Sequence, residues 1–267
     1  MRPLDIIVCM KPVPDPRRWG RLKLDPRTML LCREDISAVI NPLDRNAIEQ
    51  AVALVERFGG TVTILSMAPA DAEEQLSEAL AMGGDRAVLL SDASFAGADS
   101  LATARCLAAG IRKIGQPDLV FCGAYSLDGS TSQVGPQLAE LLDLPDLTHA
   151  VALAVEEAGV RATCSVDDGQ VVCDCALPVV VTFDKEANRP RLPTMRGIMK
   201  ASASGVVRWT AADLGLSAGE VGLAGSPTQM SNVFAPTLGR KGEMLEGPPN
   251  HAAASLLEKL RADRLVN

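Results

Sequence analysis

Aromatic side chains and positive charge are both scarce in this sequence of 267 residues. Phe, Trp and Tyr make up 3% of it, and the net charge at pH 7 is −7. Single-stranded nucleic acids stack on aromatic rings, and every phosphate backbone requires a basic protein surface. These two deficits argue against a nucleic-acid partner. Apolar residues still make up 47% of the chain, so Ala, Leu and Val can fill a substantial core.

Long hydrophobic runs are missing as well. The longest apolar stretches have the length of a strand, so no membrane span is expected. The N-terminal segment reaches Lys11 too early for a signal-peptide core, and we expect a soluble, cytoplasmic protein. Seven cysteines in such a chain fit reduced thiols. Cys173 and Cys175 lie on one face of a predicted strand without a second Cys or His cluster nearby, so we interpret them as buried thiols and predict no metal site.

The usual signatures of catalysis are also missing. The two histidines, His149 and His251, have no nucleophile near them in sequence, and no pair of acid and base residues stands out. No Gly-x-Gly-x-x-Gly motif follows the first predicted strand, and there is no Walker A motif. We therefore predict no catalytic residue.

Short apolar runs alternate with amphipathic helical patterns over the first half of the chain. Asn41 is a candidate N-cap, Pro42 suits the first helical position, and Gly59-Gly60 ends that helix. Strands that alternate with helices form parallel sheets, so we predict an α/β fold with a doubly wound, mostly parallel, Rossmann-like sheet. The predicted strands are 4–10, 61–67, 87–90 and 119–122, the predicted helices are 42–58, 71–84, 99–115 and one that follows residue 131, and a hairpin is predicted at 22–32.

After residue 150 the predicted strands follow one another without helices, which indicates an antiparallel extension of the sheet. They are predicted at 150–155, 160–166, 170–175 and 178–183. From residue 188 onward the chain is rich in Pro, Gly and Ser, and residues 252–262 form the one further predicted helix. We therefore divide the chain into an α/β domain of residues 1–187 and an irregular C-terminal arm of residues 188–267.

Several segments are predicted to lie at the carboxyl ends of strands, where doubly wound sheets bind ligands. They are residues 9–16, 41–44 and 123–142, together with Met67 at the end of another strand. In the segment 123–142 a single early carboxylate, Asp128, lies among Gly, Ser, Thr and Gln residues before a helix. The free N–H groups of such a helix suit a phosphate. An ordinary turn capped by one of the hydroxyl residues 130–132 fits equally well, and spacing alone does not decide.

Four stretches resemble the β subunit of electron transfer flavoproteins and occur in the same order as in that family. They are NPLDRNAIEQAVAL (41–54), EALAMGGDRAVLL (78–90), GAYSLDGSTSQVGPQLAELL (123–142) and RPRLPTMRGIMKA (189–201). The resemblance implies an adenine-nucleotide-binding α/β fold and a heterodimer with an α subunit that carries FAD. It also implies that the arm 188–267 packs on that α subunit.

Matching positions imply a nucleotide pocket whose loop holds phosphate through backbone amides. Asp128 is then expected to order the loop through amides and hydroxyls, because phosphate would repel a carboxylate. Lys11 is expected near a flavin, or else at the surface. The family often has Lys, Arg or Met and then Gln-Ala where this chain has residues 124–126. The implied cofactor-binding residues are Cys9, Lys11, Asn41, Pro42, Leu43, Asp44, Met67, Gly123, Ala124, Tyr125, Ser126, Asp128, Gly129, Ser130, Thr131, Ser132, Gln133 and Val134.

Members of the family differ in what the β site holds. KPVPDP (11–16), SLDGSTSQVGP (126–136) and the C-terminal KGEMLEG (241–247) resemble the electron-bifurcating type. That type implies FAD in the β site, NADH as electron donor, and ferredoxin or flavodoxin and a quinone reductase as acceptors. AMP is the alternative occupant, as in simple electron carriers.

Met195 lies where the family places the leucine that anchors it on flavin dehydrogenases. A flexible Met can fill an apolar pocket of a partner, although it could also pack on its own subunit. A different class of function is also open: a stand-alone adenine-nucleotide-binding module, colourless and without an α partner.

Overall fold

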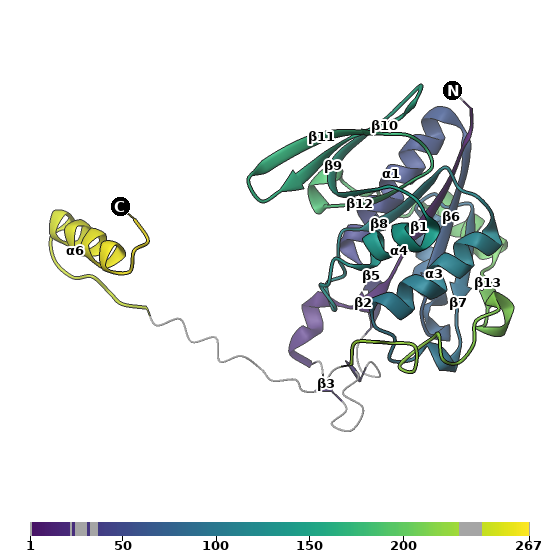
Figure 1. Ribbon diagram of the computed structural model, residues 1–267, viewed down its shortest axis with the longest axis horizontal. Coiled ribbons are helices and arrows are strands. Elements are labelled where there is room, and N and C mark those ends of the chain that lie inside the picture. The colour runs from purple at the N-terminus through teal and green to yellow at the C-terminus, as the bar shows by residue number, and fades with distance from the viewer. Residues whose placement is uncertain (1, 22, 25–30, 33–36, 230–241, 267) are drawn as a thin grey trace. The chain divides into compact units, whose positions relative to one another are not determined.

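The computed structural model describes residues 2–21, 23–24, 31–32, 37–229 and 242–266. Contacts within the chain divide it into two units, Met1–Ser231 and Asn232–Asn267 (Figure 1). The division predicted after residue 187 was based on composition and on the expected elements, and it stays a prediction. Within the chain, the first unit continues well beyond that point.

A nine-stranded sheet forms the centre of the first unit, with the strand order β11-β10-β9-β12-β8-β1-β6-β7-β13. All neighbours pair in parallel except β10, which is antiparallel to both β9 and β11. The predicted mostly parallel sheet with an antiparallel extension is confirmed. The strands are β1 (Leu4–Cys9), β6 (Gly60–Met67), β7 (Arg86–Leu90), β8 (Leu119–Gly123), β9 (Asp146–Glu156), β10 (Gly159–Val166), β11 (Gly169–Cys175), β12 (Val179–Phe183) and β13 (Val207–Trp209).

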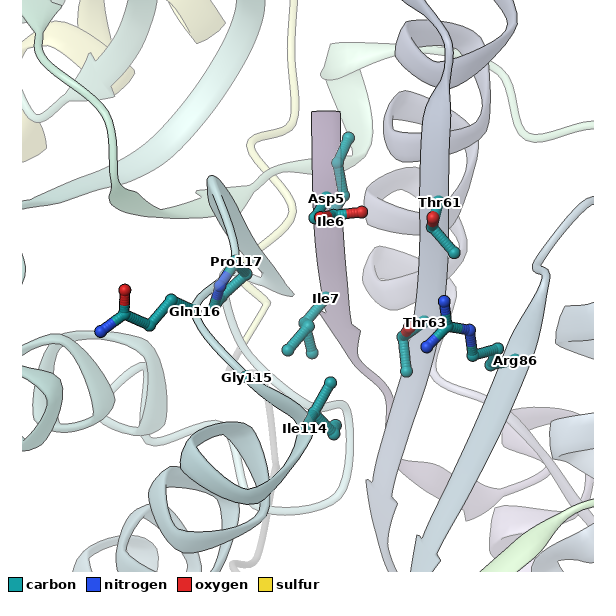
Figure 2. Close-up of a pocket in the computed structure, with 10 residues that line it drawn as sticks. All are labelled: Asp5, Ile6, Ile7, Thr61, Thr63, Arg86, Ile114, Gly115, Gln116 and Pro117. Carbon is teal, nitrogen blue, oxygen red and sulfur yellow. The ribbon is translucent and has the colours of Figure 1, made fainter. Parts of the chain in front are cut away.

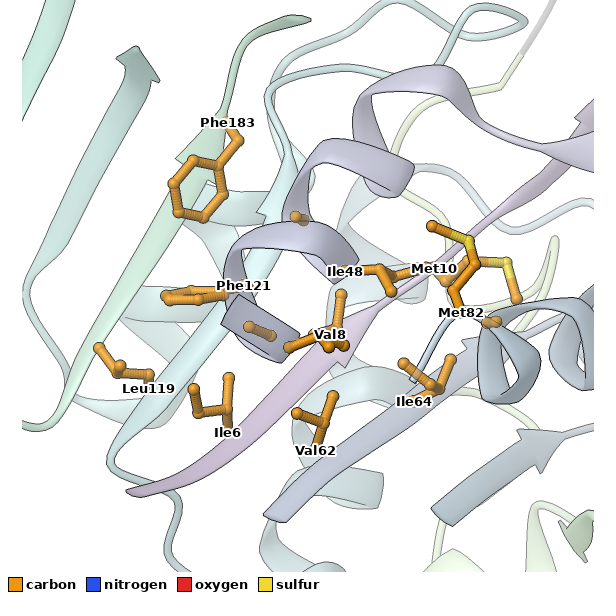
Figure 3. Close-up of a cluster of buried hydrophobic side chains, with 14 of the residues drawn as sticks. Ile6, Val8, Met10, Ile48, Val62, Ile64, Met82, Leu119, Phe121 and Phe183 are labelled. Carbon is orange, nitrogen blue, oxygen red and sulfur yellow. The ribbon is translucent and has the colours of Figure 1, made fainter. Parts of the chain in front are cut away.

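Helices cover both faces of this sheet, as a doubly wound fold requires. Helices α1, α2 and α5 bury side chains in the larger core, where Phe121 and Phe183 meet edge to face with ring centroids 4.8 Å apart (Figure 3). Helices α3 and α4 bury theirs in a second core on the other face. The helices are α1 (Pro42–Phe58), α2 (Glu73–Ala81), α3 (Ser100–Ile114), α4 (Val134–Leu142) and α5 (Met195–Ser204), with α6 (Pro249–Ala262) in the second unit.

Short elements complete the first unit. Strand β2 (Pro12–Pro14) pairs with β5 (Ala38–Ile40), and β3 (Lys23–Leu24) pairs with β4 (Leu31–Cys32), both antiparallel. The second pair agrees with the predicted hairpin at 22–32, whose residues 22 and 25–30 lie outside the described ones. The short 3-10 helices are η1 (Pro16–Arg21), η2 (Ala70–Ala72), η3 (Ala93–Phe95), η4 (Lys185–Ala187) and η5 (Ala212–Leu214).

Two elements of the segment expected to be irregular, α5 and β13, were not predicted. Thr194 caps α5 by accepting a hydrogen bond from the Gly197 N–H, and the helix packs on α2. This packing is close, since a Cβ on Gly197 would lie 2.1 Å from the Ala81 carbonyl oxygen. Ala201 is the one buried residue of α5, and the apolar residues of the helix, Met195, Ile198 and Met199, are exposed instead of packing on the core.

The described residues contain no helix that could cross a membrane, and no group of three or more His, Cys, Asp or Glu side chains that could hold a metal ion. Cys173 and Cys175 carry free thiols and are half-buried, less buried than expected.

Candidate functional site

The order of the strands reverses between β1 and β8. The chain passes from β1 through α1 and β6 to α2 and β7, and then through α3 to β8 on the other side of β1. A crevice for ligands forms at the carboxyl ends of the two strands that flank such a reversal. Val8 lies opposite Phe121 in the sheet, so Lys11 and Gly123 follow the ends of adjacent strands.

Asp44, in the first turn of α1, ties these strand ends together. Its Oδ2 accepts a hydrogen bond from the Lys11 N–H at 2.7 Å, and its Oδ1 accepts from the Gly123 N–H and from Asn41 Nδ2, each at 3.0 Å. Burial raises the pKa of Asp44 to about 6, although these three hydrogen bonds favour the carboxylate and lower it. Asp44 therefore holds the end of β8 and the residues that follow β1 against the start of α1.

Asn41 attaches the loop after β8 to the same network. Its Nδ2 donates to the Tyr125 carbonyl oxygen at 2.9 Å, and its Oδ1 accepts from the Leu127 N–H at 3.2 Å. Asn41 occupies the N-cap position of α1 as predicted, but its side chain makes no cap hydrogen bond. The Asn41 side chain bonds to the loop after β8 instead.

Gly123 leaves no room for a side chain. A Cβ at this position would lie 2.4 Å from Asp44 Oδ1 and 2.8 Å from Leu43 Cβ. Leu43 is itself buried in the core beneath the loop. The close approach of β8 to the start of α1 therefore requires glycine.

Asp128 forms an ion pair with Lys11 across the crevice. Its Oδ1 lies 2.7 Å from Lys11 Nζ and also accepts a hydrogen bond from the Gly129 N–H at 2.8 Å. Lys11 Nζ donates further to Ser126 Oγ at 3.3 Å. Only 7% of the Asp128 side chain is exposed, against 44% of that of Lys11. These contacts agree with the expectation that Asp128 orders the loop, but the ammonium partner was not foreseen.

The start of α4 differs from a capped turn. Ser130 and Ser132 have positive φ angles of 49° and 54°, which are uncommon for residues other than glycine. Gln133 occupies the N-cap position, and no side chain among the described residues makes a cap hydrogen bond there. The Thr131 hydroxyl reaches only the Gln133 N–H, at 3.4 Å. Of the two alternatives left open by the sequence, the turn capped by residues 130–132 is therefore not the one that the structure shows, and the first amides of the helix stay available to another acceptor.

Other predicted cofactor-binding residues lie at the same carboxyl ends of the strands, whereas Met195 was predicted for docking of a partner. Cys9 is buried beside Cys122 on the neighbouring strand, and a hydrogen bond with Cys9, together with burial, raises the pKa of the Cys122 thiol. Met67 is partly buried against the same core at the end of β6. Ala124 is buried and donates its N–H to the Phe183 carbonyl oxygen at 2.9 Å. Met195 begins α5, and 77% of it is exposed.

Sequence reasoning missed a histidine–aspartate pair at the same edge of the sheet. His149 Nδ1 lies 3.1 Å from Asp184 Oδ2, just past the end of β12. The two residues are 35 positions apart in strands whose neighbourhood depends on the sheet order, so no local pattern in the sequence could reveal the pair.

Two cavities lie at the opposite edge of the sheet, at the amino ends of the strands. The smaller, of about 110 Å³, is lined by residues of β1, β6 and β7, with Arg86 and Thr63 near each other (Figure 2). The larger, of about 320 Å³, shares Thr63, Arg86 and Ile114 with it. No predicted site residue lines either cavity.

Comparison with known proteins gives the chain a family context. Residues 28–214 match the family model described as electron transfer flavoprotein domain. The chain is 41% identical over 264 residues to the electron transfer flavoprotein subunit beta of Thermoanaerobacterium thermosaccharolyticum, covering 98% of this chain and 100% of the relative. It is 40% identical over 263 residues to the caffeyl-CoA reductase-Etf complex subunit CarD of Acetobacterium woodii, covering 98% and 99%. It is 38% identical over 266 residues to the protein FixA of Azorhizobium caulinodans, covering 96% and 94%.

Proposed function

The chain belongs to the electron transfer flavoprotein family as a β subunit, and from this premise we propose that it holds an adenine nucleotide between the ends of β1 and β8. We further propose that it works in a heterodimer with an α subunit that carries FAD. The observation that carries this proposal is the hydrogen-bonded frame at the carboxyl ends of these strands. Asp44 and Asn41 hold the ends of β1 and β8 and the loop 123–133 in one hydrogen-bonded frame.

The residues present fit an adenine nucleotide. The amides of residues 131, 132, 134 and 135 would hold its phosphate at the start of α4, where no side chain among the described residues caps the helix. Cys9 and Met67, at the ends of β1 and β6, would line the apolar floor. The Lys11–Asp128 pair neutralises the one carboxylate of the loop, so a phosphate nearby meets little repulsion.

We favour FAD over AMP as the occupant, with AMP as the alternative. When bound, a flavin supplies the ability to take up two electrons together and to release them singly. The chain contributes the binding of the adenine half, the orientation of the loop after β8, and Lys11, whose side chain is 44% exposed at the crevice. Electron bifurcation, with NADH as donor and ferredoxin or flavodoxin and a quinone reductase as acceptors, belongs to this proposal.

Two exposed apolar surfaces support the proposed protein partners. Leu192, Met195 and Met199 are 78%, 77% and 73% exposed on and before α5, and we assign this surface to a flavin dehydrogenase. In the second unit, Leu256 and Leu257 of α6 are 48% and 43% exposed. We assign α6 and its unit, the end of the proposed arm 188–267, to the α subunit.

The cofactor content of the purified heterodimer tests the proposal. Two flavins and no AMP per heterodimer would support FAD in the β site. One flavin with one AMP would contradict bifurcation and leave a simple electron carrier. A colourless chain that binds nucleotide without any α subunit would contradict the heterodimer and favour the stand-alone module.

A further inference from the structure

In the pair of His149 and Asp184, one ring nitrogen of the histidine has no hydrogen-bond partner among the described residues. His149 Nδ1 lies 3.1 Å and 3.3 Å from the two carboxylate oxygens of Asp184. A carboxylate only accepts, so Nδ1 carries the proton of this hydrogen bond and Nε2 is the free nitrogen. Within the described ranges, Nε2 has no hydrogen-bond partner, and 37% of the His149 side chain is exposed.

The backbone holds this histidine in an unusual conformation. His149 has a φ of 54°, at a point where the register between β9 and β12 shifts. Its N–H donates to Thr182 Oγ1 at 3.0 Å, and the Asp184 N–H donates to the Ala150 carbonyl oxygen at 3.1 Å. Left-handed residues other than glycine cost conformational energy and cluster at functional sites.

Thr182 connects this pair to the amino end of α4. The Thr182 hydroxyl accepts from His149, and on its other side a Cβ built on Gly135 would lie 2.3 Å from Thr182 Cγ2. Gly135 is in the first turn of α4, and this helix packs against both β9 and β12. Through Thr182, the backbone of His149 is therefore joined to the first turn of the helix at whose end the phosphate is proposed to bind.

A purely structural pair would explain less of this arrangement. Strands β9 and β12 are already joined by their backbone pairing and by the His149–Thr182 hydrogen bond. A pair that served only to join them would not need a strained backbone or an exposed ring. We propose that His149 is a phosphate-binding residue of the nucleotide site, positioned by Asp184; this rests on the proposed function above.

The chemistry of the pair suits an oxyanion. With Nδ1 donating to Asp184, the protonated ring presents a second N–H at Nε2, which donates a charge-assisted hydrogen bond to phosphate. Asp184 compensates the positive charge of the ring and fixes its orientation. The ligand class is a nucleoside phosphate whose phosphate group, and not its base, meets the histidine.

The test compares two ligands that differ only by a phosphate. AMP and adenosine are titrated calorimetrically into the heterodimer after its β-site nucleotide has been removed by exchange. The variants are His149→Asn, Asp184→Asn and the control His251→Asn, which changes the exposed histidine of α6. Asparagine suits position 149 because it tolerates positive φ better than alanine.

We expect His149→Asn to lower the ratio of AMP affinity to adenosine affinity about tenfold, the loss of one charge-assisted hydrogen bond. Asp184→Asn should lower the ratio by a smaller factor, and His251→Asn should leave it unchanged. Of the two histidine variants, only His149→Asn should shift the phosphorus-31 resonance of bound AMP.

The outcomes separate this inference from the function on which it rests. If the wild type binds AMP and His149→Asn keeps the same ratio, the histidine does not contact phosphate and the inference is overturned. If His149→Asn does not assemble, an unchanged ratio in Asp184→Asn overturns it equally. If the wild-type heterodimer binds neither AMP nor adenosine, the proposed nucleotide site itself is wrong.

Discussion

Replacing Asp44 by Asn removes a buried carboxylate that titrates within an accessible pH range. The wild-type side chain accepts hydrogen bonds from the Lys11 N–H, the Gly123 N–H and Asn41 Nδ2. Burial raises its pKa to about 6 in the folded protein, from an ordinary value of 3.8. Asparagine has nearly the same shape and does not titrate. Its NH2 group must face one of these N–H donors, a cost that does not vary with pH, so the pH dependence of the difference isolates the titration.

The raised pKa fixes the sign and size of the expected effect. The folded state binds this proton more tightly than the unfolded state, so the contribution to the free energy of unfolding is complete below about pH 4. It is lost as the pH rises through 6. A difference of about two pKa units corresponds to ~3 kcal/mol.

Urea unfolding of the heterodimer at a series of pH values between 4 and 8 measures this contribution. Other titrating groups cancel when the free energy of unfolding of Asp44→Asn is subtracted from that of the wild type. This difference should fall by about 2–3 kcal/mol from pH 4 to pH 7. Asp92→Asn is the control, because hydrogen bonds from the Ser94 and Ala211 amides lower the pKa of Asp92 from its ordinary value of 3.8. The stability that this carboxylate contributes is lost only below that value, so its difference should stay nearly constant between pH 4 and pH 8. A wild-type advantage over Asp44→Asn that grows with pH would refute the reasoning, since the three hydrogen bonds would then outweigh burial.

Three further substitutions probe the loop and the docking surface. Gly123→Ala should lower nucleotide content and cost about 1–3 kcal/mol of stability through overpacking against Asp44. Gly129→Ala is the control and should change neither, because a Cβ on Gly129 would have its nearest neighbour at 3.4 Å. Asp128→Ala should weaken nucleotide retention by roughly 0.5–2 kcal/mol. Equal occupancy of wild type and variant in an exchange assay would show that the Lys11–Asp128 pair does not order the nucleotide site. Met195→Ala should slow electron transfer from the partner dehydrogenase at unchanged cofactor content. The control is Met244→Ala, which changes an exposed residue of the second unit and should transfer electrons as fast as wild type in stopped-flow traces. If Met195→Ala is as fast as wild type, Met195 has no docking role.

The sequence predicts the layout of the sheet because its strands and helices are marked by local patterns. Asn41-Pro42 begins α1 and Gly59-Gly60 ends it, as expected from capping preferences. Helix α5 escapes prediction because its burial depends on the backbone contact of Gly197 with Ala81, which no apolar periodicity records. Strand β13 has three residues and is held mainly by pairing with β7, so it too depends on a distant segment.

The site is predictable to the extent that its residues follow one another in motifs. Asn41 and Asp44 are close in sequence, and their positions in the crevice follow from the start of α1. Their bonds to Lys11, Tyr125 and Gly123 depend on the reversal of strand order, which a pattern of elements indicates only in outline. The start of α4 is uncapped because of the positive φ angles at residues 130 and 132. The hydroxyl residues in the sequence do not indicate these angles.

The residues that carry the family resemblance mainly bond to one another. Asn41, Asp44 and Gly123 form a frame that fixes the loop, and Lys11 reaches the same frame through its backbone N–H. Such a frame shapes the crevice in the same way for AMP and for the adenine half of FAD. Tyr125 joins it only through its carbonyl oxygen, as acceptor from Asn41, which explains how the rim can depart from the family pattern without loss of the loop. The choice between the two cofactors must therefore depend on side chains outside the frame, on the rim and on the partner subunit.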